Sequence, residues 1–222
     1  MVSMKEEEAI EKGIDLEKLK EEQRKLAKEL ELKDAFDFSN CQRYAAIVVE
    51  SLKNRELIAS IAILDEDMKL IEDKYITRMP KFPYIPGFRA YRELPIMQAV
   101  YEKIEEFPDV IFILGQGISH SQGLGIASHL ALSLNKPVIG ITQNLLLGEE
   151  KNDEVFLGKK IIAKKIVTRE KSRPIYVSPG NLISMKTAVE VTKKCLREPH
   201  KLPEPIVMAR KTIARVKKEL GL

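Results

Sequence analysis

The chain of 222 residues is 44% hydrophobic and 32% charged, with a formal net charge of +4 at pH 7. These values predict one soluble globular domain, and the mildly basic balance permits a nucleic-acid partner without requiring one. The two cysteines, Cys41 and Cys195, lack metal-ligand spacing, which argues against a zinc site and a disulfide framework. No apolar run reaches the length of a membrane span and residues 1–13 are highly charged, so we expect no membrane partner and a cytoplasmic location.

The first segment is rich in strong helix formers. Residues 6–33 carry leucines near helical spacing, and Asp15 is a plausible N-cap. We therefore expect residues 1–34 to form an amphipathic helix packed on a single domain of residues 35–222. An exposed face of this helix would be the natural place for a protein partner.

Three strands and a proline-rich loop follow. Residues 44–50, 57–64 and 68–76 have strand patterns separated by polar turns, which predicts an antiparallel meander. Pro80, Pro83 and Pro86 then exclude regular structure. A helix is expected over residues 88–106, whose apolar side chains recur at helical spacing.

The segment of residues 110–129 organises the rest of the chain. Five apolar residues, 110–114, predict a strand buried on both faces. A glycine-rich loop and an apolar helix over residues 126–134 follow. We expect the glycines of this loop to adopt positive φ and to let the backbone approach a ligand. They are Gly115, Gly117, Gly123 and Gly125.

Polar side chains converge in the same loop. Gln116, Ser119, His120 and Ser121 follow the buried strand directly. His120 is read either as a site residue or as an ordinary surface histidine, whereas His129 is expected to pack or cap rather than react. The spacing lacks both a phosphate-loop lysine and the full dinucleotide glycine pattern, which argues against the common nucleotide sites.

The last third alternates strands with helices. Ser184 is a good N-cap, and residues 178–181 read as a turn. Together with the meander, this order predicts an α/β fold with a mixed central sheet and helices on both faces, as a ribonuclease H-like core requires. The expected strands are residues 137–142, 155–167 and 174–177, and the expected helices are residues 185–196 and 202–222.

Several exact strings resemble the endonuclease V family. They are Phe82-Pro83-Tyr84-Ile85-Pro86-Gly87, Arg92-Glu93-x-Pro95, Gly115-Gln116-Gly117-x-x-His120, Leu124-Gly125-Ile126-Ala127-Ser128-His129 and Val177-Ser178-Pro179-Gly180. The resemblance implies a ribonuclease H-like domain that cuts a nucleic-acid strand near deoxyinosine or inosine. It also implies Mg²⁺ or Mn²⁺ held by carboxylates and a proline-tyrosine loop that acts as a wedge.

Most of the family's catalytic positions are altered in this chain. Val49 and Leu114 stand where the resemblance places aspartates, and only the helix carboxylate Glu93 remains. Gln143 replaces a lysine, while Asn181 and Arg210 replace histidines. The retained positions are thus Glu93 and His120; Glu93 is equally readable as half of a structural ion pair.

Neighbouring carboxylates are poor substitutes for the missing aspartates. Glu50 should point to the opposite face of its strand from Val49, and Asp109 precedes Leu114 by five residues, roughly 16 Å at strand rise. A magnesium site requires several hard oxygen ligands. We therefore expect no bound metal and no cofactor. If a metal does bind, Glu93 is the expected ligand, and if the protein is active, Mg²⁺ or Mn²⁺ is the expected cofactor.

The resemblance also assigns a surface for the nucleic acid and its base. Tyr84 is read either as a stacking wedge or as a tyrosine packed between prolines. A phosphate path could run along the lysines and arginines between residues 159 and 173, which include Lys164, Lys165 and Lys171. The expected binding residues are Pro83, Tyr84, Ile85, Pro86, Gly87, Gly115, Gln116, Gly117 and Leu146.

Three functions remain open from the sequence. The leading one is a family member that binds DNA or RNA, at inosine-containing or distorted strands, without cleaving it. The second is an active nuclease with a rebuilt metal site, in which Glu50 is the first residue to test. The third is a protein-interaction scaffold that has no affinity for nucleic acid.

Overall fold

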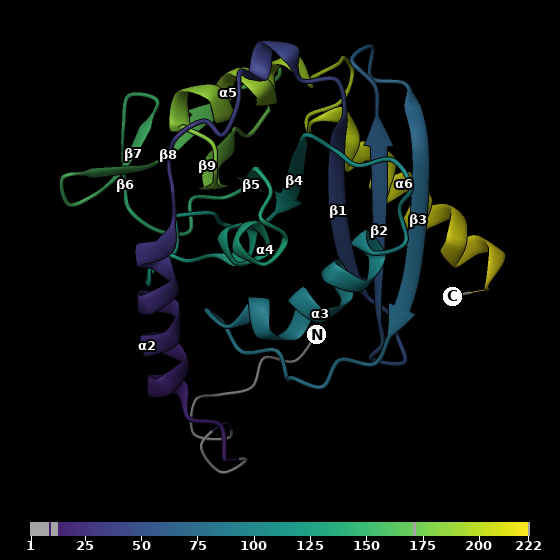
Figure 1. Ribbon diagram of the computed structural model, residues 1–222, viewed down its shortest axis with the longest axis horizontal. Helices are drawn as coiled ribbons and strands as arrows, with labels where there is room; N and C mark the ends of the chain where they lie inside the picture. The colour runs from purple at the N-terminus through teal and green to yellow at the C-terminus, as the bar shows by residue number, and fades with distance from the viewer. Residues whose placement is uncertain (1–8, 10–12, 171, 222) are drawn as a thin grey trace.

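The computed structural model describes residue 9, residues 13–170 and residues 172–221. Its strands form one sheet in the order β3-β2-β1-β4-β5-β9-β8-β7-β6 (Figure 1). The three central pairs make the sheet mixed, because β1–β4 and β4–β5 are parallel whereas β5–β9 is antiparallel. The strands are β1 (Tyr44–Ser51), β2 (Leu57–Leu64), β3 (Leu70–Arg78), β4 (Val110–Leu114), β5 (Val138–Thr142), β6 (Glu149–Lys151), β7 (Glu154–Leu157), β8 (Lys160–Ile166) and β9 (Ile175–Asn181).

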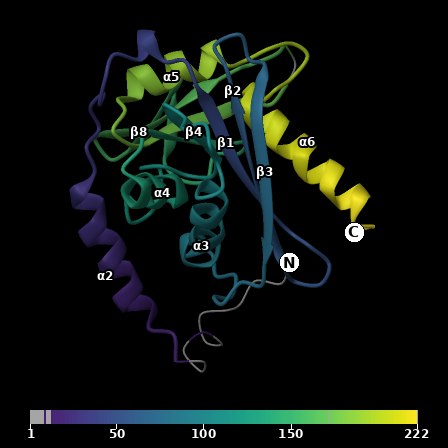
Figure 2. The same cartoon turned by 45° about the vertical axis from the view of Figure 1, so that its right-hand side comes forward.

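Helices cover both faces of the sheet, as the sequence predicted. On one face, α3 (Arg89–Tyr101) and α4 (Ile126–Leu134) contribute to one hydrophobic cluster. On the other, α5 (Met185–Lys194) and α6 (Glu204–Glu219) contribute to a second. Figure 2 shows α3 and α6 on opposite sides of β1–β3. Each strand of the centre is therefore apolar on both sides, which explains its unbroken hydrophobic sequence.

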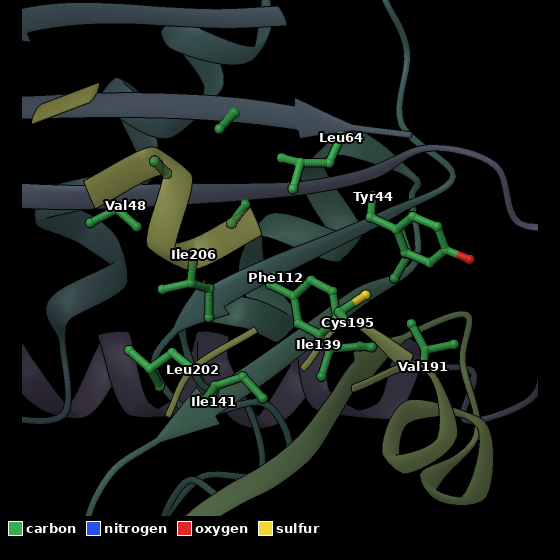
Figure 3. Packing of buried hydrophobic residues seen from close by; sticks show 14 of the residues in the cluster. Tyr44, Val48, Leu64, Phe112, Ile139, Ile141, Val191, Cys195, Leu202 and Ile206 are labelled. Atoms are coloured by element: carbon green, nitrogen blue, oxygen red, sulfur yellow. The ribbon is translucent and has the colours of Figure 1, made fainter. Parts of the chain in front are cut away.

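The cluster beneath α5 and α6 contains both cysteines. Cys195 packs beside Tyr44 and Phe112 (Figure 3), and the Tyr44 hydroxyl donates a hydrogen bond to the Cys41 carbonyl at 2.8 Å. Burial raises the pKa of the Cys41 thiol to about 11 and also raises the pKa of Cys195. Both thiols are buried and unpaired, so they act as small core side chains.

The amino-terminal helix is shorter than predicted. Helix α2 runs over Leu16–Leu26, and Asp15 caps it by accepting from the Lys18 amide at 2.9 Å. The helix tightens into a 3₁₀ turn, Ala27–Glu29, and then becomes extended. The reason is tertiary: the Glu31 amide and carbonyl bond to Asn181 and Leu182. The predicted helical residues 6–8 and 10–12 lie outside the described residues.

Two local predictions in the carboxyl half were wrong. Residues 178–181 form part of β9 rather than a turn, because β9 pairs with β5, with a register shift at Val138/Ile139 that accommodates Pro179 and Gly180. Residues 155–167 form two strands rather than one. Gly158, at φ +60°, reverses the chain between β7 and β8. The short strand β6 was not predicted.

The predicted helix of residues 88–106 also ends earlier. Helix α3 stops at Tyr101, and the amides of Glu105 and Glu106 donate to the Glu72 carboxylate instead of continuing the helix. Pro95 is inside α3, where it removes one helical donor. The N-cap prediction for α5 is confirmed, since Ser184 Oγ accepts from the Thr187 amide.

Candidate functional site

A pocket of about 440 Å³ opens at the carboxyl end of β4, as expected for a sheet with α/β connections. Its walls come from the proline loop, the glycine-rich loop, α2 and the segment after β5. The lining residues are Gln23, Tyr84, Pro86, Gly87, Arg89, Ala90, Gly115, Gln116, His120, Ser121, Leu124, Gly125, Ile126, Leu146 and Leu147. Parts of both predicted site segments, residues 83–87 and 115–121, therefore meet at one place.

The glycines of the loop act mainly through close packing, not through positive φ. Only Gly123 of the four has positive φ, at +72°, which corrects the expectation for the others. A Cβ on Gly117 would lie 2.1 Å from the Pro179 carbonyl oxygen, and one on Gly125 would lie 2.1 Å from that of Gln116. These glycines thus allow the loop to fold against β9 and α4, while Gly117 itself does not line the pocket.

His120 is a buried pocket residue. Its Nδ1 accepts from the Gln122 amide at 3.3 Å, and it also contacts the backbone of Gly87. Burial lowers its pKa, so the ring is neutral at physiological pH. His120 is 7% exposed and lines the pocket, so it is not an ordinary surface histidine.

His129 is buried in α4 and does not line the pocket. Its ring packs edge-on against Tyr91, with ring centroids 5.5 Å apart. Among the described residues, its Nε2 has no hydrogen-bond partner. Burial, aided by nearby His120, lowers its pKa to about 4. The expectation of a packing histidine therefore agrees with the structure.

We expect His129 to make the fold sensitive to acid. Its folded pKa lies below the unfolded value, so the stabilisation is complete above about pH 6.5 and is lost as the pH falls toward 4. Lowering the pH from 6.5 to 5 should cost roughly 1.5 kcal/mol through this residue. Chemical denaturation of wild type and His129→Leu at both pH values measures the difference; an equal pH dependence would contradict the assignment.

Glu93 takes part in an ion pair beside the pocket. Arg89 Nε donates to Glu93 Oε1 at 2.7 Å, and Arg89 Nη1 donates to the Leu114 carbonyl at 2.7 Å. The Glu93 side chain is 7% exposed, and its Oε2 has no partner among the described residues. The Arg89 guanidinium thus links the Glu93 carboxylate to the backbone of Leu114, the position where the family resemblance implied an aspartate.

The other candidate ligands lie elsewhere. Val49 packs in the cluster beneath α3 and α4, whereas Leu114 packs in the cluster beneath α5 and α6. Glu50 points to the α6 face, where it pairs with Lys217, so the predicted opposite orientations of Val49 and Glu50 are observed. Asp109 accepts from the amides of Gln42 and Arg43, at the far end of β4.

A divalent cation held as the family implies does not fit this donor set. Among the described residues, Glu93 Oε2 is the one buried carboxylate oxygen without a hydrogen-bond partner, but Oε1 is already paired with Arg89. Within the described part of the chain, no three His, Cys, Asp or Glu side chains gather into a possible metal site. One carboxylate that is already paired with Arg89 supplies too few hard ligands for magnesium.

The remaining altered positions are dispersed. Gln143 directly follows β5, at the same edge of the sheet as Leu114. Asn181 is buried at the carboxyl end of β9, next to Val138 at the start of β5 and so at the other edge of the sheet from Gln143. Its Oδ1 accepts a hydrogen bond from the Glu31 amide. Arg210 is exposed on α6. None of these three residues lines the pocket.

The expected wedge loop is split between pocket and core. Tyr84, Pro86 and Gly87 line the pocket, and Tyr84 is half-buried. Ile85 instead packs in a small cluster with Leu16 of α2. Leu146 is 62% exposed and borders the pocket on the side of the β5 segment. Pro83 does not line the pocket.

Two of the lining residues that sequence reasoning missed, Gln23 and Arg89, carry polar side chains. Gln23 of α2 is 1% exposed, donates from Nε2 to the Gly87 carbonyl at 3.0 Å, and has no partner for Oε1 among the described residues. Its position as a polar residue within the leucine pattern was the available signal. Arg89 precedes Glu93 by four residues, a spacing that predicts an ion pair on a helix.

Part of the basic surface is neutralised within the fold. Lys164 pairs with Glu154, and Lys165 pairs with Glu150. Lys159 and Lys160 are exposed at the β7–β8 turn, while Lys171 lies outside the described residues. Any electrostatic attraction of a polyanion to this hairpin is therefore weaker than the count of lysines suggests.

Among the described residues, no helix is both long and apolar enough to cross a membrane.

Comparison with known proteins decides the family. A family model described as Endonuclease V matches residues 24–211. The chain belongs to the endonuclease V family. The Endonuclease V of Thermosipho melanesiensis is 36% identical over 222 residues, covering 95% of this chain and 92% of that protein. The Endonuclease V of Rippkaea orientalis is 37% identical over 199 residues, covering 85% and 86%.

Solved structures confirm the ribonuclease H-like fold predicted through the endonuclease V resemblance. A crystal structure of human ENDOV superposes with a TM-score of 0.84 at 24% identity, covering 94% of this chain and 100% of that one. The Ciona intestinalis Endonuclease V, crystallised with a 24mer DNA containing an inosine followed by a ribo-adenosine, gives 0.83 at 23% identity and covers 92% and 98%. These similarities establish the shared fold.

Proposed function

We propose that this endonuclease V homologue binds nucleic-acid strands, including inosine-containing ones, without cleaving them. The observation that carries the proposal is the loss of ligand oxygens: the partly buried side chains of Val49 and Leu114 are hydrocarbon and pack against two hydrophobic clusters. Hydrolysis of a phosphodiester by the family's chemistry needs a cation that activates water and screens charge. The donor set around Glu93 does not supply such a site.

Binding is supported by the parts of the site that survive. The pocket keeps the backbone of Gly115 and Gln116, the ring of Tyr84 and the buried His120. These groups can hold an extruded base by stacking and by backbone hydrogen bonds, neither of which requires a metal. The Ciona relative, crystallised with inosine-containing DNA, has the same fold.

The first test is a cleavage assay on labelled inosine-containing DNA and RNA strands, with Mg²⁺ or Mn²⁺. We expect every strand to remain intact while a gel-shift assay detects complexes. A Glu93→Ala variant provides the control. Cleavage by the wild-type protein that Glu93→Ala abolishes would refute the inactivity and establish a metal site built around Glu93.

An active enzyme with a rebuilt site is the second candidate. The partnerless Glu93 Oε2 favours it, because a buried carboxylate oxygen ordinarily has a hydrogen bond or a cation. Glu50 does not help, since it is ion-paired with Lys217 on the other face of the sheet. A Glu50→Gln variant should therefore behave as wild type in the same cleavage assay.

We also propose that the described part of the amino-terminal segment, residue 9 and residues 13–34, packs on a single domain of residues 35–222. The contacts support this: Gln23 bonds to Gly87, Arg24 bonds to Gln122, and the Tyr91 hydroxyl donates to the Leu19 carbonyl.

A titration of strand affinity at two salt concentrations distinguishes nucleic-acid binding from a pure interaction scaffold, which would show no affinity.

A further inference from the structure

We propose that the Arg89 guanidinium serves as a built-in cation that holds a phosphodiester group at the pocket, without metal. This inference deepens the proposed strand binding and rests on it. Arg89 lines the pocket and has a side chain 33% exposed, so it is open to a ligand. It is bonded both to Glu93 and to the Leu114 carbonyl.

The guanidinium is fixed on one side and open on the other. An arginine has five N–H donors, of which one goes to Glu93 Oε1 and one to the Leu114 carbonyl. The other three have no acceptor among the described residues. Because two hydrogen bonds hold the planar group, little side-chain entropy remains to be lost when a ligand binds.

Glycine makes room for this arrangement. A Cβ on Gly115 would lie 3.3 Å from Arg89 Nη1 and 2.4 Å from the side chain of Ile126. The backbone of the glycine loop therefore lies directly against the guanidinium. Arg89 lines the same pocket of about 440 Å³ that would receive the base. A strand whose base enters the pocket would therefore bring a phosphate of its backbone close to Arg89.

The chemistry of the open donors selects a phosphate oxygen. Two parallel N–H groups of a guanidinium match the geometry of two phosphate oxygens, and the ionic hydrogen bonds are stronger than neutral ones. The Glu93 carboxylate orients Arg89 but also offsets its positive charge. Glu93 is therefore a positioning residue that opposes the attraction of the site for an anion.

This arrangement predicts opposite effects from its two residues. Arg89→Met should weaken binding of an inosine-containing strand by roughly tenfold or more, since hydrogen bonds to a charged group are lost. Glu93→Gln should strengthen binding a few-fold, because the positive charge is no longer offset. A metal site built on Glu93 predicts the reverse for Glu93→Gln, since a ligand would be lost.

The test is fluorescence anisotropy with a labelled inosine-containing strand, in EDTA and in Mn²⁺. We expect equal wild-type affinity in both buffers. Arg43→Met is the matched control: it removes one arginine ion-paired with Glu106 at the other end of β1, and should change affinity by less than about twofold. The double variant Arg89→Met/Glu93→Gln also removes the Glu93 carboxylate that Arg89→Met leaves without its partner. It should therefore fold normally, and weak binding by it would reflect the loss of Arg89 rather than a folding defect.

Each outcome decides the proposal. It is supported if Arg89→Met and the double variant both bind weakly while Glu93→Gln binds more tightly. It is overturned if EDTA abolishes wild-type binding, if Glu93→Gln binds more weakly, or if the folded double variant binds as wild type. Failure of the wild type to bind any strand refutes the proposed function and the phosphate site together, whereas normal binding without an Arg89 effect refutes the phosphate site alone.

Discussion

Gly117→Ala should destabilise the protein by roughly 3 kcal/mol or more, because the added methyl group meets backbone and not a movable side chain. The new Cβ would lie 2.1 Å from the Pro179 carbonyl oxygen and 2.7 Å from that of Ser178. Relief would require the glycine loop to move away from β9, breaking the bond from the Ile118 amide to the Pro179 carbonyl. The expected result is a lower denaturant midpoint and loss of strand binding.

Gly158→Ala is the matched control for this substitution. Gly158 lies at the β7–β8 turn with φ +60°, and a Cβ there would have nothing within 4 Å. Its cost is limited to backbone strain, about 1 kcal/mol. Urea denaturation of both variants measures the difference. Equal losses would show that close packing at Gly117 does not determine the stability of the loop.

Arg89→Met should cost about 2 to 3 kcal/mol of stability, because it leaves Glu93 as a buried carboxylate with no partner. This cost lies just below the range for breaking a fully buried pair, since the Arg89 side chain is 33% exposed. Adding Glu93→Gln to Arg89→Met should recover most of the loss. A double-mutant cycle by urea denaturation at neutral pH gives the coupling free energy.

The same cycle at the exposed pair Lys186–Glu190 of α5 is the comparison. That pair has the same spacing along a helix, but its side chains are 85% and 61% exposed. Its coupling should stay below about 0.5 kcal/mol. If the two cycles gave equal values, burial of Glu93 would not be the source of the effect at Arg89.

Unbroken apolar runs made parts of the fold predictable. The bounds of β2, β4 and α4 agree with the predictions to the residue, because each run is buried and lies between clear polar or glycine segments. The motif resemblance placed the glycine and proline loops at one site. Residues 178–181 failed because their local turn signal is overridden by pairing with β5.

The contents of the site were less predictable, since they depend on contacts distant in sequence. Gln23 reaches Gly87 across 64 positions, and Arg89 reaches the Leu114 carbonyl across 25. The glycines of the loop were recognised, but their role as points of backbone contact needed the position of β9. A hydrophobic pattern identifies which side chains are buried, not which polar groups meet.

The bond between Gln23 and Gly87 has a practical implication for trimming the gene. The family match begins at residue 24, one position after the glutamine that forms part of the pocket wall. A shortened protein cut to residues 24–211 would keep every motif of the resemblance yet lose this side chain and its hydrogen bond to the proline loop. Such a truncation would remove one wall of the pocket and leave the Gly87 carbonyl without its donor.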